Sequence, residues 1–218
     1  MKNKILIYGL IIGSLCIAIT YWVLSRELEN KVGEKIDELN GVAVYYNGYI
    51  ATVIGRNKTA DGYNIGLKYQ CVEFVKRYYF EYLGHRMPDS YGHAYDFFNI
   101  HLKNGEVNIR RDLVQFINGN GDKPQADDII VFAPTTFNPY GHIAIVSRVD
   151  YNAIEIVQQN PGPFSSSRER FYLVFENNKF RVENNRVLGW LRKKIIPKTL
   201  FQNDNGFRTG WLRTVHHD

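Results

Sequence analysis

A long uncharged run near the amino terminus separates this chain from an ordinary globular domain. From Ile5 to Leu24 it reads ILIYGLIIGSLCIAITYWVL, and Lys2 and Lys4 precede it. As a helix rising ~1.5 Å per residue, the run is about as long as the ~30 Å hydrocarbon core of a bilayer. A cleavable signal peptide normally has an apolar region of only ~7 to 15 residues and a small-x-small cleavage site, and no clear site closes this run. We therefore expect one uncleaved transmembrane helix.

The charges around this run predict its orientation. Lysines on its amino-terminal side favour a cytoplasmic amino terminus, although Arg26, Lys31 and Lys35 on the other side reduce the asymmetry. We expect a single-pass protein of the cytoplasmic membrane whose remaining chain lies in the periplasmic or extracellular space.

The rest of the chain has the composition of one globular domain with extensions. Of 218 residues, 44% are hydrophobic and 22% charged, which is enough for one core. We divide the chain into an anchor with the start of a stalk at 1–31, a domain at 32–195 and a basic tail at 196–218, with a charged, helix-compatible stalk over 27–39. A net charge of +5 is common among proteins without acidic partners, and no nucleic-acid partner is predicted.

Cys71, in the stretch GLKYQCVEFVKRYY, is the only cysteine outside the apolar run. An exported domain meets an oxidising environment in which cysteines usually pair, and Cys16 should lie in the membrane. An unpaired thiol in that setting favours a reactive role, although a lone cysteine is by itself more often a small core residue.

The spacing around Cys71 predicts a helix. Apolar or aromatic side chains at 71, 74, 75, 78 and 82 follow the helical period, and Gly84 supplies a stop. Cys71 would lie in the first turn, where the helix dipole favours a thiolate. The backbone N–H of Cys71, with the Gln70 side chain as a second donor, could stabilise an oxyanion.

A histidine is expected to lie opposite this helix on an antiparallel sheet. Asp128 to Ala133 reads as a short buried strand, and HIAIVSRVDYNAIEIVQQN as two strands joined around Tyr151. A turn centred there brings His142 opposite Asn160, with Gln158 on the same face one pair along. A slip of one residue would move both amides to the other face. His142 would then take the thiol proton while Asn160 or Gln158 holds the imidazole.

Further strands are predicted near the carboxyl end. Residues 171–175 and 180–182 flank Asn177-Asn178, a pair that tolerates the positive φ of a tight turn, and 187–191 reads as another strand.

Four motifs in this order, KYQCVEFVKRYY, ADDIIVF, GHIAIV and IEIVQQN, resemble those of the CHAP domain, the cysteine- and histidine-dependent amidohydrolases/peptidases of the papain-like, NlpC-type group. More narrowly, the stretch from Gly41 to about Lys194 is similar to the amidase domain of glutathionylspermidine amidase/synthetases, with GVAVYYNGY before the cysteine and GHAYDFFNIHL after the helix. The resemblance implies an α+β, papain-like fold in which N-terminal helices carrying the nucleophile pack on an antiparallel β-sheet.

The resemblance places the family's nucleophile on Cys71 and its histidine on His142. Its E-Q-N segment corresponds to Gln158, Gln159 and Asn160, so a neutral amide stands at the acidic position. Because an amide stabilises an imidazolium less strongly than a carboxylate does, Asn160 is the preferred orienting residue.

The resemblance also assigns two residues to substrate binding, Lys76 and Arg77, where the family tends to have two arginines. Lysine lacks bidentate carboxylate recognition, which weakens the case for a glutathione-like substrate.

The remaining histidines are not predicted to bind a metal. The tripeptide Tyr-Gly-His occurs at 91–93 and again at 140–142, and we interpret His93 as a structural or rim residue. No companion ligands at recognisable spacing accompany the others, so no metal and no cofactor are predicted. These others are His85, His101, His216 and His217.

These observations predict a membrane-anchored cysteine amidohydrolase or peptidase that cleaves an amide through a thioester. Location favours a peptidoglycan peptide, while the motifs favour a glutathionylspermidine-like amide. We rank the wall peptide first because glutathione conjugates are mainly cytoplasmic in that family and no synthetase domain accompanies this one. The rival prediction is a non-catalytic wall-binding or adaptor module, which only Gln158 motivates.

Overall fold

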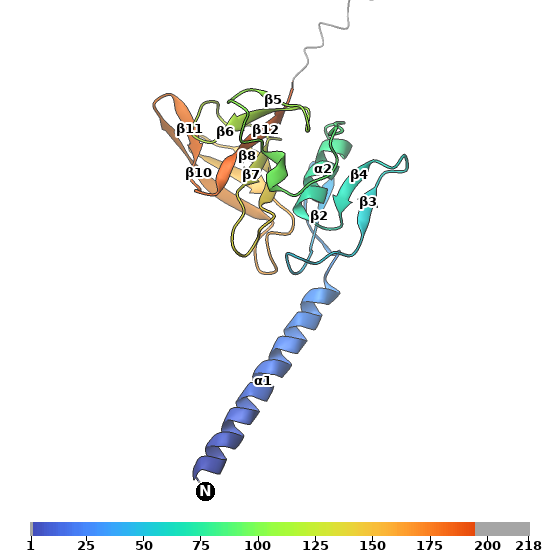
Figure 1. Ribbon diagram of the computed structural model, residues 1–218, viewed down its shortest axis with the longest axis vertical. Helices are drawn as coiled ribbons and strands as arrows, with labels where there is room; N and C mark the ends of the chain where they lie inside the picture. Colours follow the sequence, from blue (N-terminus) through green and yellow to red (C-terminus); the bar gives the residue numbers. More distant parts are fainter. Residues whose placement is uncertain (1, 195–218) are drawn as a thin grey trace, which may run out of the picture.

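The apolar run forms helix α1 (Lys2–Asn30), which projects from the rest of the chain as a rod (Figure 1). The computed structural model describes residues 2–194, so the predicted tail at 196–218, with His216 and His217, lies outside the described residues. Within α1, Tyr8–Leu28 is long and apolar enough to cross a membrane, by length and composition, and none of it is buried against the domain.

The helix joins the domain without the predicted stalk. The helix α1 ends at Asn30, and its last turns contact the domain: the Ser25 and Tyr49 hydroxyls lie 3.5 Å apart. Residues expected to continue the stalk instead form strand β1 (Lys35–Leu39), which pairs with β2 (Val42–Tyr45). The tight turn between them is Asn40-Gly41, with φ of +49° and +84°, a hairpin signal that outweighs the helix-compatible charges. The stalk prediction over 27–39 is therefore wrong.

Eight antiparallel strands form the main sheet, in the order β11-β10-β9-β8-β7-β12-β6-β5. A separate hairpin of β3 and β4 lies beyond helix α2, on the side away from this sheet (Figure 1). The bounds of the elements after β2 are β3 (Arg56–Lys58), β4 (Asn64–Leu67), α2 (Cys71–Glu81), the 3-10 helix η1 (Tyr95–Phe97), β5 (Val107–Asn108), β6 (Leu113–Ile117), β7 (Ile129–Phe132), β8 (His142–Val149), β9 (Ala153–Val157), β10 (Arg168–Glu176), β11 (Lys179–Val182) and β12 (Val187–Lys193).

Alternation along the central strands supplies both faces of the sheet with apolar side chains. In β7, Ile129 and Val131 join the cluster that contains Phe74 of α2, whereas Ile130 and Phe132 join the cluster on the other face. The central strands are buried on both faces, which explains why their sequences are continuous apolar runs. The predicted α+β architecture with an antiparallel sheet is confirmed, with α2 as the one α-helix of the described chain besides α1.

The predicted strands match the structure closely. The strand expected from Asp128 to Ala133 is β7, the pair joined around Tyr151 is β8 and β9, and the Asn177-Asn178 turn joins β10 to β11 with φ of +52° and +59°. The register centred on Tyr151 is confirmed at Ile145–Val157 and Val146–Ile156, and a bulge shifts it by one residue nearer the turn.

A buried ionic network fixes α2 to the surrounding elements. The Glu73 carboxylate, in the first turn of α2, pairs with Arg77 Nε at 2.8 Å and accepts hydrogen bonds from Asn57 Nδ2 at 2.8 Å and Gln159 Nε2 at 2.9 Å. Gln159 also donates to the Gln70 carbonyl at 3.0 Å. Because a buried charge is costly unless paired and hydrogen-bonded, these groups hold α2, β3 and the segment after β9 in one arrangement.

Arg77→Leu should destabilise the fold by about 3–5 kcal/mol, because it leaves the Glu73 carboxylate buried without its counter-charge. The measurement is urea unfolding of the full chain in detergent, followed by tryptophan fluorescence. Arg170→Leu is the matched control: it removes an exposed arginine paired with Asp150 and should cost at most about 1 kcal/mol. Equal losses in the two variants would show that the Glu73–Arg77 pair contributes no more than a surface pair.

Candidate active site

One cavity of about 380 Å³ contains both residues predicted to react. Cys71, at the start of α2, and His142, at the start of β8, both line it. Helix α2 packs directly on β8, so elements far apart in the sequence bring Cys71 and His142 to the same cavity. Gly141, with φ of +70°, precedes the histidine, and a Cβ at that position would lie 2.8 Å from the Phe132 carbonyl oxygen. Only glycine therefore fits where β8 begins.

The Cys71 side chain is almost completely buried in the wall of this cavity. Burial raises the pKa of its thiol to about 11, and hydrogen bonding from the backbone N–H groups of Ile143, Val72 and Cys71 opposes this only in part. The expected stabilisation of a thiolate by the helix amino terminus is therefore outweighed by burial, because removal from water penalises the charged form. The thiol is protonated at neutral pH in this structure.

His142 is held by an amide, as predicted, and the amide is Gln158. The imidazole Nε2 and Gln158 Oε1 lie 2.9 Å apart. Gln158 Nε2 donates to the Ser166 carbonyl at 3.1 Å and to Glu169 Oε2 at 3.4 Å, which sets its oxygen toward the ring. The imidazole proton therefore lies on Nε2, and Nδ1 is left as the acceptor for a thiol proton.

The environment of His142 favours the neutral imidazole. Burial and, to a lesser extent, the nearby Arg186 guanidinium lower its pKa to about 4, and the Gln158 hydrogen bond opposes this only in part. The resting pair of Cys71 and His142 is thus neutral, not the ion pair expected from the sequence.

Asn160, preferred from the sequence as the orienting residue, has a different position. It follows the end of β9 and has φ of +58°, so its side chain leaves the face that the predicted register assigned to it. Asn160 Nδ2 donates to Gln70 Oε1 at 2.6 Å and to the Ile50 carbonyl at 3.0 Å. Among the described residues it has no hydrogen bond with His142, so the choice of Asn160 over Gln158 is wrong.

The Gln70 side chain is also not free to act as an oxyanion donor. Its Nε2 donates to the carbonyls of Ile50 at 3.0 Å and Thr52 at 2.8 Å, while its Oε1 accepts from Asn160. Gln70 and Asn160 together fix the loop at 50–52 against the start of α2. The prediction that Gln70 supplies the second donor is therefore not supported, whereas the Cys71 backbone N–H remains at the helix start, without an intrahelical acceptor.

Lys76 and Arg77 do not line the cavity, contrary to their predicted role in substrate binding. Both are buried: Arg77 pairs with Glu73, and Lys76 Nζ donates to the carbonyls of Asn64 and Ser90. Strand β4 covers Lys76, and β2 covers Arg77, whose Nη2 donates to the Ala43 carbonyl at 2.7 Å.

Three residues that sequence reasoning did not assign to the site support the histidine. They are Glu169 behind Gln158, Ser166 as acceptor for the same amide, and Arg186, whose guanidinium lies 5.8 Å from the centre of the Phe132 ring beside His142. All come from segments after β9, and no local spacing relates them to the motifs. His93 lines the rim of the cavity, with its ring 4.8 Å from Tyr140, as expected of a rim residue.

Comparison with known proteins agrees with the motifs. Residues 58–160 match the family described as the CHAP domain, which confirms the resemblance. The matched stretch contains Cys71 and His142 and ends at Asn160.

The similarity to glutathionylspermidine enzymes is also confirmed. The chain is 28% identical over 170 residues to the bifunctional glutathionylspermidine synthetase/amidase of Escherichia coli, covering 69% of this chain and 27% of that protein. It is 30% identical over 165 residues to glutathionylspermidine synthase of Crithidia fasciculata, covering 69% and 22%. Trypanothione synthetase of the same organism is 27% identical over 119 residues, covering 55% and 18%. The chain thus spans about a quarter or less of the length of these relatives.

Lowering the pH should destabilise the fold through His142. Its pKa is about 4 when folded and about 6.5 when unfolded, so only the unfolded state gains a proton as the pH falls between these values. The stability present above pH 6.5 is lost progressively toward pH 4, by about 3 kcal/mol.

Urea midpoints of wild type and His142→Gln from pH 7 to pH 4 test this expectation. The variant should lose less stability over that range, because it has no imidazole to protonate. Parallel curves would mean that His142 is protonated in the native state.

Proposed function

We propose that this protein is a membrane-anchored, papain-like cysteine hydrolase that cleaves an amide bond in peptidoglycan peptides. Cys71 is the nucleophile, His142 the general base and acid, and Gln158 the residue that orients the imidazole. The observation that carries this proposal is the shared cavity, which Cys71 and a histidine with its Nδ1 unprotonated both line. The match to the CHAP domain and the similarity to a synthetase/amidase support an amidase chemistry.

The reaction begins from the neutral pair. As Cys71 Sγ attacks the carbonyl carbon of the substrate, its proton passes to His142 Nδ1. The oxyanion that forms lies near the Cys71 backbone N–H at the start of α2. The imidazolium then protonates the leaving amine, and the carbon–nitrogen bond breaks to leave a thioester. Water, deprotonated by His142, attacks the thioester and releases the carboxylic acid and the thiol.

The neighbours of Gln158 explain why an amide stands where the related amidases have an acidic residue. Its Nε2 faces two acceptors, the Ser166 carbonyl and Glu169 Oε2. A carboxylate at 158 would lose both hydrogen bonds and lie beside the negative charge of Glu169. The amide satisfies these acceptors and still presents an oxygen to His142, so it orients the ring without promoting a resting ion pair.

The lining of the cavity favours a wall peptide over a polyamine conjugate. Among the described residues that line it there is one arginine and no carboxylate. Spermidine carries several positive charges, and this cavity offers them no counter-charge. The competing candidate, a glutathionylspermidine-type amidase, is supported by the similarity to the glutathionylspermidine synthetase/amidase of Escherichia coli and the glutathionylspermidine synthase of Crithidia fasciculata.

Product analysis should separate the two substrates. The full chain in detergent is incubated separately with purified peptidoglycan and with glutathionylspermidine, and products are identified by mass spectrometry. We expect muropeptide fragments that are absent with Cys71→Ala. Release of glutathione and spermidine alone would establish the competing candidate. The absence of product with both substrates would favour the non-catalytic module.

The role of Gln158 can be tested in the same assay. Gln158→Ala should lower kcat by about 10- to 100-fold with little change in KM, because the imidazole loses its orienting bond but the cavity lining is kept. Asn160→Ala acts on the loop at 50–52 and should change KM more than kcat. If Gln158→Ala keeps wild-type kcat, the orienting role is excluded.

The proposed topology places the amino terminus in the cytoplasm and the domain on the other side of the membrane. The length and apolar character of Tyr8–Leu28 support this placement, together with the lysines before it. A β-lactamase fused after Asp218 should protect bacterial cells expressing the protein from ampicillin. The same fusion without residues 1–31 is the control, and equal resistance in both would exclude the anchor as the export signal.

A further inference from the structure

We propose that the cavity contains a second functional feature, a subsite that binds a carboxylate of the substrate, formed by the Arg56 guanidinium and the backbone N–H groups of Ser90 and Gly92. The inference rests on the proposed function for the identity of the substrate, but its geometry is independent of the catalytic step. All three residues line the same cavity as Cys71.

Neighbouring residues hold the Arg56 side chain in position but do not neutralise its charge. It is the first residue of β3 and lies opposite Leu67, four residues before Cys71. Its Nη1 donates to Asn64 Oδ1 at 2.9 Å, and its guanidinium lies 5.6 Å from the centre of the Tyr91 ring. Within the described chain no carboxylate pairs with it, so its other donors remain for a ligand.

Two carbonyls of the loop at 89–92 accept hydrogen bonds from Arg111, which does not line the cavity. Arg111 donates to the carbonyls of Asp89 at 2.5 Å and Tyr91 at 3.1 Å, and the Ser90 carbonyl accepts from Lys76 at 2.8 Å and from Asn64 Nδ2 at 2.7 Å. In a trans peptide the N–H lies opposite the preceding C=O, so the N–H groups of Ser90 and Gly92 face the other way. Neither N–H has an acceptor among the described residues. Convergent free N–H groups of this kind form anion-binding concavities.

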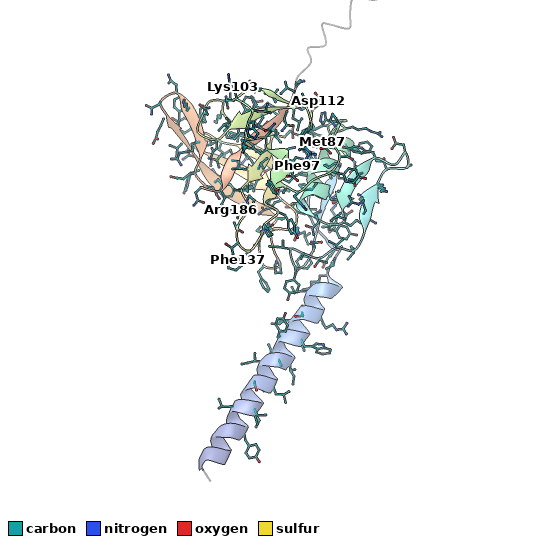
Figure 2. All side chains as sticks on the ribbon, in the orientation of Figure 1. Met87, Phe97, Lys103, Asp112, Phe137 and Arg186 are labelled. Atoms are coloured by element: carbon teal, nitrogen blue, oxygen red, sulfur yellow. The ribbon has the colours of Figure 1, made fainter. Side chains whose placement is uncertain are left out.

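Two buried cations strengthen the positive potential behind this loop. Lys76 is 1% exposed and Arg111 is completely buried, and neither forms an ion pair within the described chain. Arg111 lies 3.9 Å from the ring centre of the buried Phe97, which Figure 2 labels. Burial, with the charges of Arg111 and Arg56, lowers the pKa of Lys76 to about 7, although Asp89 opposes this; Asp89 and Asp96 likewise oppose the lowering of the pKa of Arg111 by burial. An anion bound at the loop would relieve this repulsion.

The natural ligand of such a subsite is a carboxylate near the scissile amide. A guanidinium with adjacent N–H donors matches the two oxygens of a carboxylate. A polyamine would be repelled at the same place.

The rate at which Cys71 is alkylated by a charged and by a neutral reagent tests whether the subsite attracts a carboxylate. This test does not require the substrate to be known. Iodoacetate and iodoacetamide react alike, forming a sulfur–carbon bond, releasing iodide and transferring the thiol proton to base, but only iodoacetate carries a carboxylate. The full chain in detergent is treated with each reagent. The tryptic peptide that spans residues 69–76 reports Cys71 separately from Cys16 by mass spectrometry.

We expect Arg56→Gln to lower the ratio of the iodoacetate rate to the iodoacetamide rate by about tenfold, because the attraction of one unit charge is lost in a partly enclosed site. Arg56→Lys should keep most of the ratio. The matched control is Arg170→Gln, which removes the same charge from β10, outside the cavity. Equal ratios for Arg56→Gln and Arg170→Gln would overturn the proposal.

Protection experiments distinguish the sources of the carboxylate. A purified muropeptide or S-methylglutathione is added before iodoacetamide, and protection of Cys71 is compared between wild type and Arg56→Gln. Protection that Arg56→Gln abolishes supports the subsite, and the protecting compound identifies the source; protection that survives the substitution counts against it. The catalytic proposal is tested separately. It fails if the rate of Cys71 alkylation by iodoacetamide is the same in wild type and in His142→Ala.

Discussion

The buried carboxylate of Glu73 is the group on which the arrangement of the site depends. It lies two residues after Cys71 in the first turn of α2, and Arg77, Asn57 and Gln159 all donate to it. A carboxylate removed from water is tolerated only when its oxygens are fully engaged, so these groups must meet in the folded state. Since Gln159 also donates a hydrogen bond to the Gln70 carbonyl, the network positions the backbone immediately before Cys71.

The same segment after β9 has three adjacent amides with three different tasks. Gln158 orients His142, Gln159 completes the Glu73 network, and Asn160 holds Gln70 and the loop at 50–52. A side-chain amide offers both a hydrogen-bond donor and an acceptor. It suits these three positions because each lies beside carbonyl or carboxylate oxygens that need a donor. The cost is a histidine without a direct anionic partner, and the low pKa of His142 follows from that together with burial. In the proposed reaction, proton transfer from Cys71 to His142 therefore accompanies the attack and does not precede it as a stable ion pair.

Regular elements could be predicted from the sequence, and the roles of buried polar residues could not. The helix at Cys71, the strands β7 to β12 and the register of β8 on β9 follow from periodicity and turn residues, which are local signals. Lys76 and Arg77 have the composition of a solvated helix face, but β4 covers Lys76 and β2 covers Arg77, and no local pattern predicts that packing. The predicted pair of His142 and Asn160 did not form, because the ladder ends at Ile145–Val157 and Asn160 has a positive φ.

The contacts at the end of α1 connect this helix to the residues that line the cavity. The Gly33 N–H donates to the Tyr46 carbonyl and the Tyr46 N–H to the Glu34 carbonyl, both at 2.8 Å, so the chain enters the domain without a free linker. The loop that follows Tyr46 contacts α1 through Tyr49, and its next residues line the cavity. Phe137, 92% exposed, lies at the same end of the domain (Figure 2). On the proposed topology, the distance between the bilayer and Cys71 is therefore set by direct contacts, and the enzyme would act only on amides that reach that fixed height above the membrane.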